Sequence, residues 1–289
     1  MMPHGIVEYR KKKFVVPLQQ TQLQKTSIRD SFHKERIARI KQAFTTADAG
    51  QKPQLIPLNH ESLVAFLEAR GIPRHHLVEG SIPADSLSFM AKVLTDQLPK
   101  DRPLKAIHIG NFVGVSLTYL TAVLTSLHPS SRVVGIDPNL PHRGVIDPQA
   151  HVAALLSASA LQKNVLLIAG YSSSKSISND GVVFDGYDPS VQLASESGCE
   201  ECVSSLAHIA HGKFDLVLMD GNHEAEYLKG EILNSAKMLR KGGLIVLDDV
   251  DVNWQELKDV FGQIKSMGFT SLGTDGRIGI ARLDESQDS

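Results

Sequence analysis

Short apolar segments alternate with amphipathic segments from Pro103 onward, and this alternation restricts the fold more than any other feature of the chain. The apolar segments predict strands at 105–109, 132–136, 164–169, 214–219 and 244–247. The amphipathic segments predict helices near 115–127, 148–161, 197–211, 224–240 and 254–267. Strands that alternate with helices form parallel βαβ units whose helices cover both faces of the sheet. The pattern therefore predicts a doubly wound α/β fold.

The C-terminal part of the chain departs from this alternation. Two strand-like runs, at 269–274 and 277–283, follow one another without a helix between them. They are joined by Asp275-Gly276, a strong signal for a hairpin turn. A mostly parallel sheet that ends in an antiparallel hairpin is a more restrictive prediction than a doubly wound sheet alone.

The first hundred residues differ in character from the rest. Residues 1–26 are basic and rich in Gln without apolar periodicity, which predicts a tail or an arm on the surface. Apolar residues at helical spacing predict three helices, at 27–44, 61–70 and 83–98. We therefore divide the chain into an N-terminal tail and helical cap, residues 1–100, and an α/β domain, residues 101–289. The N-terminal helices offer a surface for a homodimer.

Composition excludes several classes of function. The 289 residues include 30 basic and 32 acidic side chains, and a net charge of -2 provides no electrostatic footprint for nucleic acid. No apolar run approaches the ~20 residues of a membrane span, and the basic run at 10–13 precedes too few apolar residues for a signal peptide. Two cysteines build no disulfide framework. We expect a cytoplasmic globular protein that binds neither nucleic acid nor membrane.

The two cysteines have the spacing of metal ligands. Cys199 and Cys202, followed by His208 and His211, are residue types that bind zinc. On a helix the cysteines belong to an apolar stripe, while the histidines fall largely outside it. The pattern indicates core packing rather than a zinc site.

A glycine-containing turn follows the first strand of the α/β domain. In residues 109–116, IGNFVGVS, the glycines allow a tight turn and a close approach of ligand to backbone. The following helix begins at the carboxyl edge of the sheet, where nucleotides bind. Asp137, after the second strand, is placed to accept hydrogen bonds from ribose hydroxyls. Structural roles in a turn or a cap are the alternative for each of these residues.

Carboxylates also follow the fourth and fifth strands. Asp220 ends the run FDLVLMD, and Asp248 and Asp249 end the run GGLIVLDD. These strand ends converge, so the three carboxylates should lie together beside the nucleotide crevice. Such groups repel one another unless they are protonated or bridged by a cation, and oxygen ligands favour Mg²⁺, Ca²⁺ or Mn²⁺. The alternative is that one of them caps a backbone amide and another pairs with Arg or Lys.

Together these motifs resemble the class I S-adenosylmethionine-dependent methyltransferases over about residues 80–283. The similarity is closest to the O-methyltransferase branch that includes the caffeoyl-CoA, catechol and macrolide-sugar enzymes. A dinucleotide-dependent dehydrogenase would carry Gly-x-Gly-x-x-Gly instead, and it has no reason for the terminal hairpin. The resemblance implies a Rossmann-like, seven-stranded sheet, mostly parallel with a C-terminal antiparallel hairpin, preceded by N-terminal helices.

The resemblance also implies roles for individual residues. The residues expected to bind S-adenosylmethionine all lie in turns that follow strands or at a helix start, and they are Gly110, Asn111, Gly114, Ser116, Asp137, Ser172, Ser173 and Asp220. Asp137 would hold the ribose hydroxyls, and Ser172 and Ser173 would flank the adenine. Asp220, Asp248 and Asp249 match the positions that hold a divalent cation in metal-dependent members. Asp220 and His223 are the expected catalytic residues.

The predicted reaction is O-methylation of a small hydroxylated molecule, assisted by Mg²⁺ or another divalent cation. Methyl transfer depends mainly on alignment, because the sulfur leaving group departs neutral. A cation-bound hydroxyl loses its proton more easily, and His223 can accept a proton near neutral pH.

One position departs from the family pattern. His108 stands where most relatives carry an acidic residue that helps to hold the amino group of the cofactor. An imidazole does not accept that charge-assisted hydrogen bond as a carboxylate does. The alternatives are therefore a metal-independent N- or C-methyltransferase, an NAD-type oxidoreductase, and a non-catalytic binding protein on a methyltransferase fold.

Overall fold

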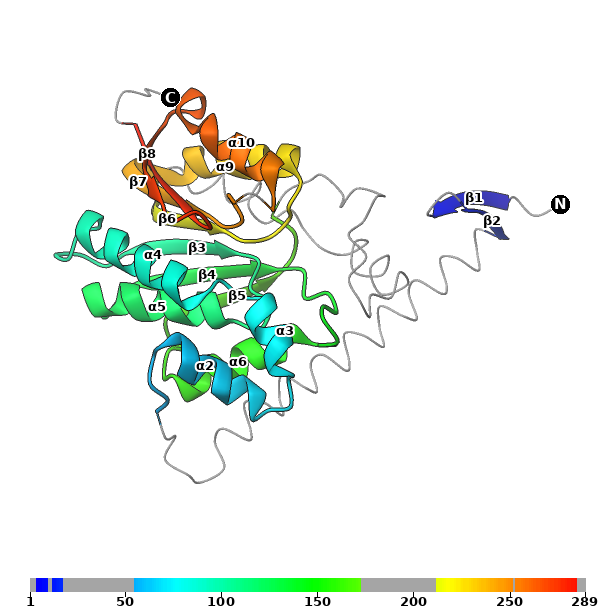
Figure 1. The fold of residues 1–289 in the computed structure, drawn as a ribbon, viewed down its shortest axis with the longest axis horizontal. Helices are drawn as coiled ribbons and strands as arrows, with labels where there is room; N and C mark the ends of the chain where they lie inside the picture. Colours follow the sequence, from blue (N-terminus) through cyan, green and yellow to red (C-terminus); the bar gives the residue numbers. More distant parts are fainter. Residues whose placement is uncertain (1–3, 10–11, 18–54, 173–211, 252, 285–289) are drawn as a thin grey trace.

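A seven-stranded sheet forms the centre of the computed structural model, which describes residues 4–9, 12–17, 55–172, 212–251 and 253–284 (Figure 1). Its strands are β3 (Lys105–Ile109), β4 (Arg132–Asp137), β5 (Val165–Ala169), β6 (Phe214–Met219), β7 (Leu239–Leu247), β8 (Phe269–Thr274) and β9 (Gly279–Leu283). The spatial order is β5-β4-β3-β6-β7-β9-β8. The strands from β5 to β7 pair in parallel, whereas β9 pairs antiparallel with both β7 and β8. The predicted fold class is confirmed.

The strand order locates the ligand crevice. The chain passes from β3 through β4 to the edge strand β5, and it then returns to place β6 on the other side of β3. The direction of winding therefore reverses between β3 and β6. Sheets of this kind bind ligands at such a reversal, outside the carboxyl ends of the strands.

Helices cover both faces of the sheet (Figure 1). On one side lie α2 (His60–Glu68), α4 (Ala84–Gln97), α5 (Val115–Leu127) and α6 (Pro148–Ala158), and on the other lie α9 (Ala225–Met238) and α10 (Gln255–Gly262). Alternate residues of β6 enter two different apolar clusters: Leu216 and Leu218 join the α5 side, while Val217 and Met219 join the α9 side. A strand buried on both faces is apolar throughout, which explains why the run at 214–219 has no polar alternation beyond its second residue.

The described part of the N-terminal region shares the core of the α/β domain. Leu63 and Leu67 of α2 and Met90 of α4 belong to the same buried cluster as Leu117 and Leu120 of α5. A short helix, α3 (Arg74–Glu79), connects α2 to α4 and was not predicted. No helix of the described residues combines the length and the apolar character that a bilayer crossing requires.

Two strands replace part of the predicted irregular tail. β1 (His4–Tyr9) and β2 (Lys12–Pro17) pair antiparallel, with Ile6 opposite Val15. Each strand contains β-branched residues that favour extended backbone, a signal that the basic and Gln-rich composition of the region obscured. The predicted helices at 27–44 and 197–211, and the Cys199, Cys202, His208 and His211 set, lie outside the described residues.

Candidate active site

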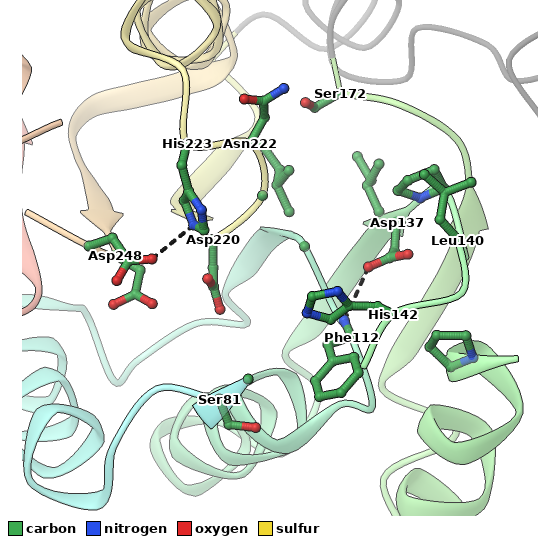
Figure 2. A pocket seen from close by; sticks show the side chains of 18 of the residues that line it. Ser81, Phe112, Asp137, Leu140, His142, Ser172, Asp220, Asn222, His223 and Asp248 are labelled. Atoms are coloured by element: carbon green, nitrogen blue, oxygen red, sulfur yellow. Dashed lines mark hydrogen bonds and ion pairs between the residues drawn. The ribbon is translucent and has the colours of Figure 1, made fainter. Parts of the chain in front are cut away.

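A pocket of about 280 Å³ lies at the carboxyl ends of the parallel strands (Figure 2). Its walls come from the strand ends, from the loop after β4 and from residues 79–81 at the end of α3. The predicted site residues that line it are Gly110, Asp137, Ser172, Asp220, His223, Asp248 and Asp249. Figure 2 shows Asp220 and His223 on one side of the pocket and Asp137 on the other.

Three other predicted site residues do not line the pocket. Ser116 and His108 are both buried, and the distance from Ser116 Oγ to His108 Nε2 is 3.0 Å. The side chain of Asn111 packs against Gly135, and Gly114 begins α5 with a left-handed φ of 92° beside Val152. These residues hold the turn together within the protein. Ser173 lies outside the described residues.

His108 is a strand histidine enclosed by the protein. Its side chain is fully buried in β3 and is absent from the pocket lining. Burial lowers the pKa of this imidazole to about 3, so it is neutral at physiological pH. The departure from the family pattern at this position therefore places no charge in the pocket.

Asp137 connects the loop after β4 to the glycine-containing turn after β3. Its Oδ2 accepts hydrogen bonds from the backbone N–H groups of Asn111 at 2.8 Å and Phe112 at 3.1 Å. Its Oδ1 accepts from the backbone N–H of Asn139 at 2.6 Å. Burial raises the pKa of Asp137, and these three hydrogen bonds oppose that rise. A carboxylate offers about four acceptor positions, so about one remains for a ligand.

Gly110 allows β3 and β6 to approach at the pocket floor. It has a φ of 81°, and a Cβ at this position would lie 1.7 Å from the carbonyl oxygen of Asp220. By contrast, Gly242 has a similar φ of 73° and no atom within 4 Å of such a Cβ. Both glycines therefore have a left-handed φ, but only Gly110 lies against the backbone of another segment.

Replacing Gly110 by Ala is expected to destabilise the protein by more than about 3 kcal/mol, because backbone strain and a clash with backbone act together. Gly242→Ala, which adds the strain alone, is expected to cost about 1–2 kcal/mol. Urea unfolding of the two variants measures both effects. Equal losses would show that the close approach to Asp220 contributes nothing.

An acidic cluster with one arginine forms the opposite wall of the pocket from Asp137. Arg277, which lies between β8 and β9, donates from Nε to Asp248 Oδ1 and from Nη2 to Asp248 Oδ2, both at 2.8 Å. Its Nη2 also lies 3.0 Å from Asp249 Oδ1. The other carboxylate oxygen of Asp249, Oδ2, lies 2.8 Å from His223 Nε2. The hairpin thus contributes the positively charged guanidinium of Arg277 to the site.

The charges of this cluster are only partly balanced. Burial and the neighbouring Asp248 and Asp249 raise the pKa of Asp220 well above its usual value, while Arg277 acts in the opposite direction. Hydrogen bonds to Asp248 raise the pKa of Arg277, which is charged at every relevant pH. One arginine thus faces three carboxylates. A bound cation would supply the missing positive charge.

One group of side chains that could hold a metal ion shares Asp220 and Asp249 with the predicted set and also includes His223. Ligand atoms of Asp220, His223 and Asp249 lie within 4.8 Å of one another, whereas Asp248 is engaged by Arg277. His223 Nε2 and Asp249 Oδ1 are buried, and neither atom makes a hydrogen bond of acceptable geometry among the described residues, although both lie close to an oppositely charged group. Two carboxylates and one imidazole are donors that divalent ions accept, so the residues fit a cation.

Two pocket residues, Arg277 and Trp254, carry no recognisable signal in the sequence. Arg277 directly follows the hairpin turn, and its position near the acidic cluster cannot be predicted without the pairing of β9 with β7. Trp254, the only tryptophan of the chain, lines the pocket, and its ring centroid lies 4.3 Å from that of His223. No local pattern marked it, because it precedes α10 and is 37% exposed.

Comparisons with known proteins agree with this fold. A family model described as a methyltransferase domain matches residues 107–250, which run from within β3 to just after β7. The cofactor-bound structure of Rv0187 from MTB is 18% identical, with a TM-score of 0.50, and the match covers 83% of this chain and 93% of that one. No curated protein sequence matches the chain.

Two further solved structures are similar over the same share of this chain. The SAH-bound methyltransferase PaMTH1 of Podospora anserina is 16% identical, with a TM-score of 0.49 and coverage of 83% and 94% of the two chains. A methyltransferase from Geobacter sulfurreducens is 15% identical, with a TM-score of 0.48 and coverage of 83% and 95%. Structural similarity at these identities concerns the fold, whereas the family model concerns the class of protein.

The family model, the strand order and the pocket at the strand ends define the class together. The chain belongs to the class I S-adenosylmethionine-dependent methyltransferases.

Proposed function

We propose that this methyltransferase transfers the methyl group of S-adenosylmethionine to a hydroxyl of a small molecule, and that a divalent cation assists the transfer. The observation that carries the proposal is the convergence of Asp220, His223 and Asp249 in the wall of the pocket. These residues would hold the cation, which would lower the pKa of the acceptor hydroxyl and position it.

The cofactor is proposed to lie along the strand ends, from the acidic cluster to Asp137 and on to Ser172. Gly110 would let the cofactor approach the backbone, because it presents no side chain to the pocket. The remaining acceptor position of Asp137 would bind one ribose hydroxyl. Ser172, after β5, would face the adenine. This order places the sulfonium end of the cofactor nearest Asp220 and His223.

The protein groups around the acceptor have separate tasks in this proposal. The acceptor oxygen forms a bond to the methyl carbon as the carbon–sulfur bond breaks, and S-adenosylhomocysteine leaves neutral. The hydroxyl proton would pass to solvent in this mechanism, because an imidazole that holds the cation has no free lone pair to accept it. Asp249 would orient the imidazole of His223. Arg277 would hold Asp248 and Asp249 in place.

A metal-independent methyltransferase is the second candidate, and Arg277 is the observation that favours it. Its guanidinium already pairs with Asp248 and contacts Asp249, so part of the negative charge is neutralised within the protein. In that case the His223–Asp249 contact alone would provide the base. The two candidates differ in their dependence on free divalent ions.

Removal of divalent ions is expected to lower turnover at least about tenfold, with recovery on addition of Mn²⁺ or Mg²⁺, because cation assistance contributes several kcal/mol to such reactions. The measurement is release of S-adenosylhomocysteine by EDTA-treated protein, with a panel of small phenols and sugars as acceptors. Calorimetry with Mn²⁺ alone tests the site without an acceptor. Full turnover in EDTA, with no Mn²⁺ binding, would favour the metal-independent candidate.

A further inference from the structure

A buried carboxyl group lies behind the pocket wall at some distance in sequence from the acidic cluster. Glu231, on α9, is 1% exposed and does not line the pocket. Its Oε1 is hydrogen-bonded to the hydroxyl of Ser172, and its Oε2 has no hydrogen-bond partner among the described residues. Ser172 does line the pocket, and so does Tyr227, whose hydroxyl lies 3.0 Å from Ser172 Oγ. Glu231 is therefore connected to the pocket lining by its hydrogen bond to Ser172.

Among the described residues Glu231 has no cationic partner, in contrast to the buried Asp215 and Asp248. Asp215 pairs with Arg102, and Asp248 pairs with Arg277. The described hydrogen-bond partner of Glu231 is the hydroxyl of Ser172, after β5, which in turn lies 3.0 Å from the hydroxyl of Tyr227 on the same helix as Glu231. Burial raises the pKa of Glu231 to about 8, and the hydrogen bond to Ser172 limits the rise. The carboxyl is consequently neutral at pH 7.

The protonation of Glu231 decides what Ser172 presents to the pocket. A serine hydroxyl has one proton and two lone pairs. If Glu231 is ionised, the carboxylate takes the serine proton as its hydrogen bond, and Ser172 is only an acceptor toward the pocket. If Glu231 is neutral, the carboxyl donates to Ser172 Oγ, and the serine proton becomes available to Tyr227 or to a ligand. The ring nitrogens of adenine accept hydrogen bonds and match the second arrangement, whereas its 6-amino group donates and would match the first.

We propose that Glu231 is a positioning residue for the cofactor, which in its neutral form directs the hydroxyl proton of Ser172 toward the adenine. This inference rests on the cofactor placement proposed above and is independent of the cation. It assigns a role to a side chain that neither contacts the cofactor nor takes part in methyl transfer.

Calorimetric titration with S-adenosylhomocysteine at about pH 7 and about pH 9 tests the proposal. The wild-type protein is expected to bind about fivefold more weakly at the higher pH, as expected for the loss of one hydrogen bond. Glu231→Gln, whose amide donates to Ser172 at both pH values, is expected to bind within about twofold of wild type at pH 7. It should lack the additional weakening at pH 9. Any effect from titration of the ligand itself is common to both proteins.

Two further variants complete the experiment. Glu226→Gln alters an exposed carboxylate on the same helix and should retain the wild-type pH dependence. Ser172→Ala removes the donor and should bind about fivefold more weakly at pH 7, with no extra loss from Glu231 at pH 9. This variant provides the test if Glu231→Gln does not fold.

The outcomes separate this inference from the proposed function. Wild-type pH dependence in Glu231→Gln, or wild-type affinity in Ser172→Ala, would overturn the role of Glu231 while leaving the cofactor site in place. Wild-type protein that binds S-adenosylhomocysteine equally at both pH values would overturn it as well. A wild-type protein that does not bind S-adenosylhomocysteine would overturn the cofactor placement and the inference together.

Discussion

Replacing Asp249 by Asn is expected to lower kcat by about 100-fold or more and to leave the affinity for S-adenosylmethionine within about twofold. Asp249 lies in the proposed cation set and also contacts His223, so both candidate mechanisms require its charge. The residue has a left-handed φ of 57°, a conformation that Asn adopts as readily as Asp. The substitution therefore removes charge without adding backbone strain.

The measurement is steady-state turnover together with cofactor titration by calorimetry. Loss of a negative neighbour should also lower the pKa of Asp220, because Asp249 is one of the charges that raise it. Asp259→Asn, on the exposed side of α10, is the matched control and should behave as wild type. Full activity of Asp249→Asn would exclude both the cation set and the His223 base. In the cation-assisted mechanism, the variant should also bind Mn²⁺ more weakly, by about 10- to 100-fold.

Asp137→Ala is expected to weaken the binding of S-adenosylmethionine by about 10- to 100-fold and to lower the stability by several kcal/mol. The substitution leaves three backbone N–H groups, those of Asn111, Phe112 and Asn139, without their acceptor. It also removes the position proposed for a ribose hydroxyl. The loop after β4 and the turn after β3 would then separate at the cofactor site.

Asp215→Ala controls for the loss of a buried carboxylate. Asp215 also accepts a backbone hydrogen bond, from Lys105 at 2.8 Å, but it lies at the amino end of β6, away from the pocket. Both variants should unfold at lower urea concentration, and only Asp137→Ala should change the cofactor affinity measured by calorimetry. Unchanged affinity in Asp137→Ala would remove this residue from the cofactor site.

Strand positions and types followed directly from the sequence. The runs at 105–109, 214–219 and 269–274 coincide with β3, β6 and β8 in the structure. β3 and β6 are mostly apolar and almost wholly buried, and turn residues follow the run at 269–274, so the local pattern distinguishes all three. The strands β1 and β2 were missed, because a basic and Gln-rich segment carries too weak a pattern to outweigh its composition.

The site was predictable as far as it depends on strand ends. Asp137, Asp220, Asp248 and Asp249 all line one pocket because parallel strands deliver their carboxyl ends to one edge. The direction in which a side chain points after the strand depends on contacts that sequence spacing does not contain. Asn111 and Ser116 were expected beside the cofactor, yet their side chains face Gly135 and His108 inside the protein.

The sequence by itself determined the class of fold, the edge of the sheet that binds ligands and the carboxylates that gather there. Only the tertiary structure decided how those carboxylates are partnered. Arg277 reaches Asp248 because β9 lies antiparallel beside β7, and Glu231 reaches Ser172 because the segment that follows β5 lies against α9. The first contact joins residues 29 positions apart in the sequence, and the second joins residues 59 positions apart. Local periodicity reports burial within one element, whereas these pairings arise only when separate elements pack together.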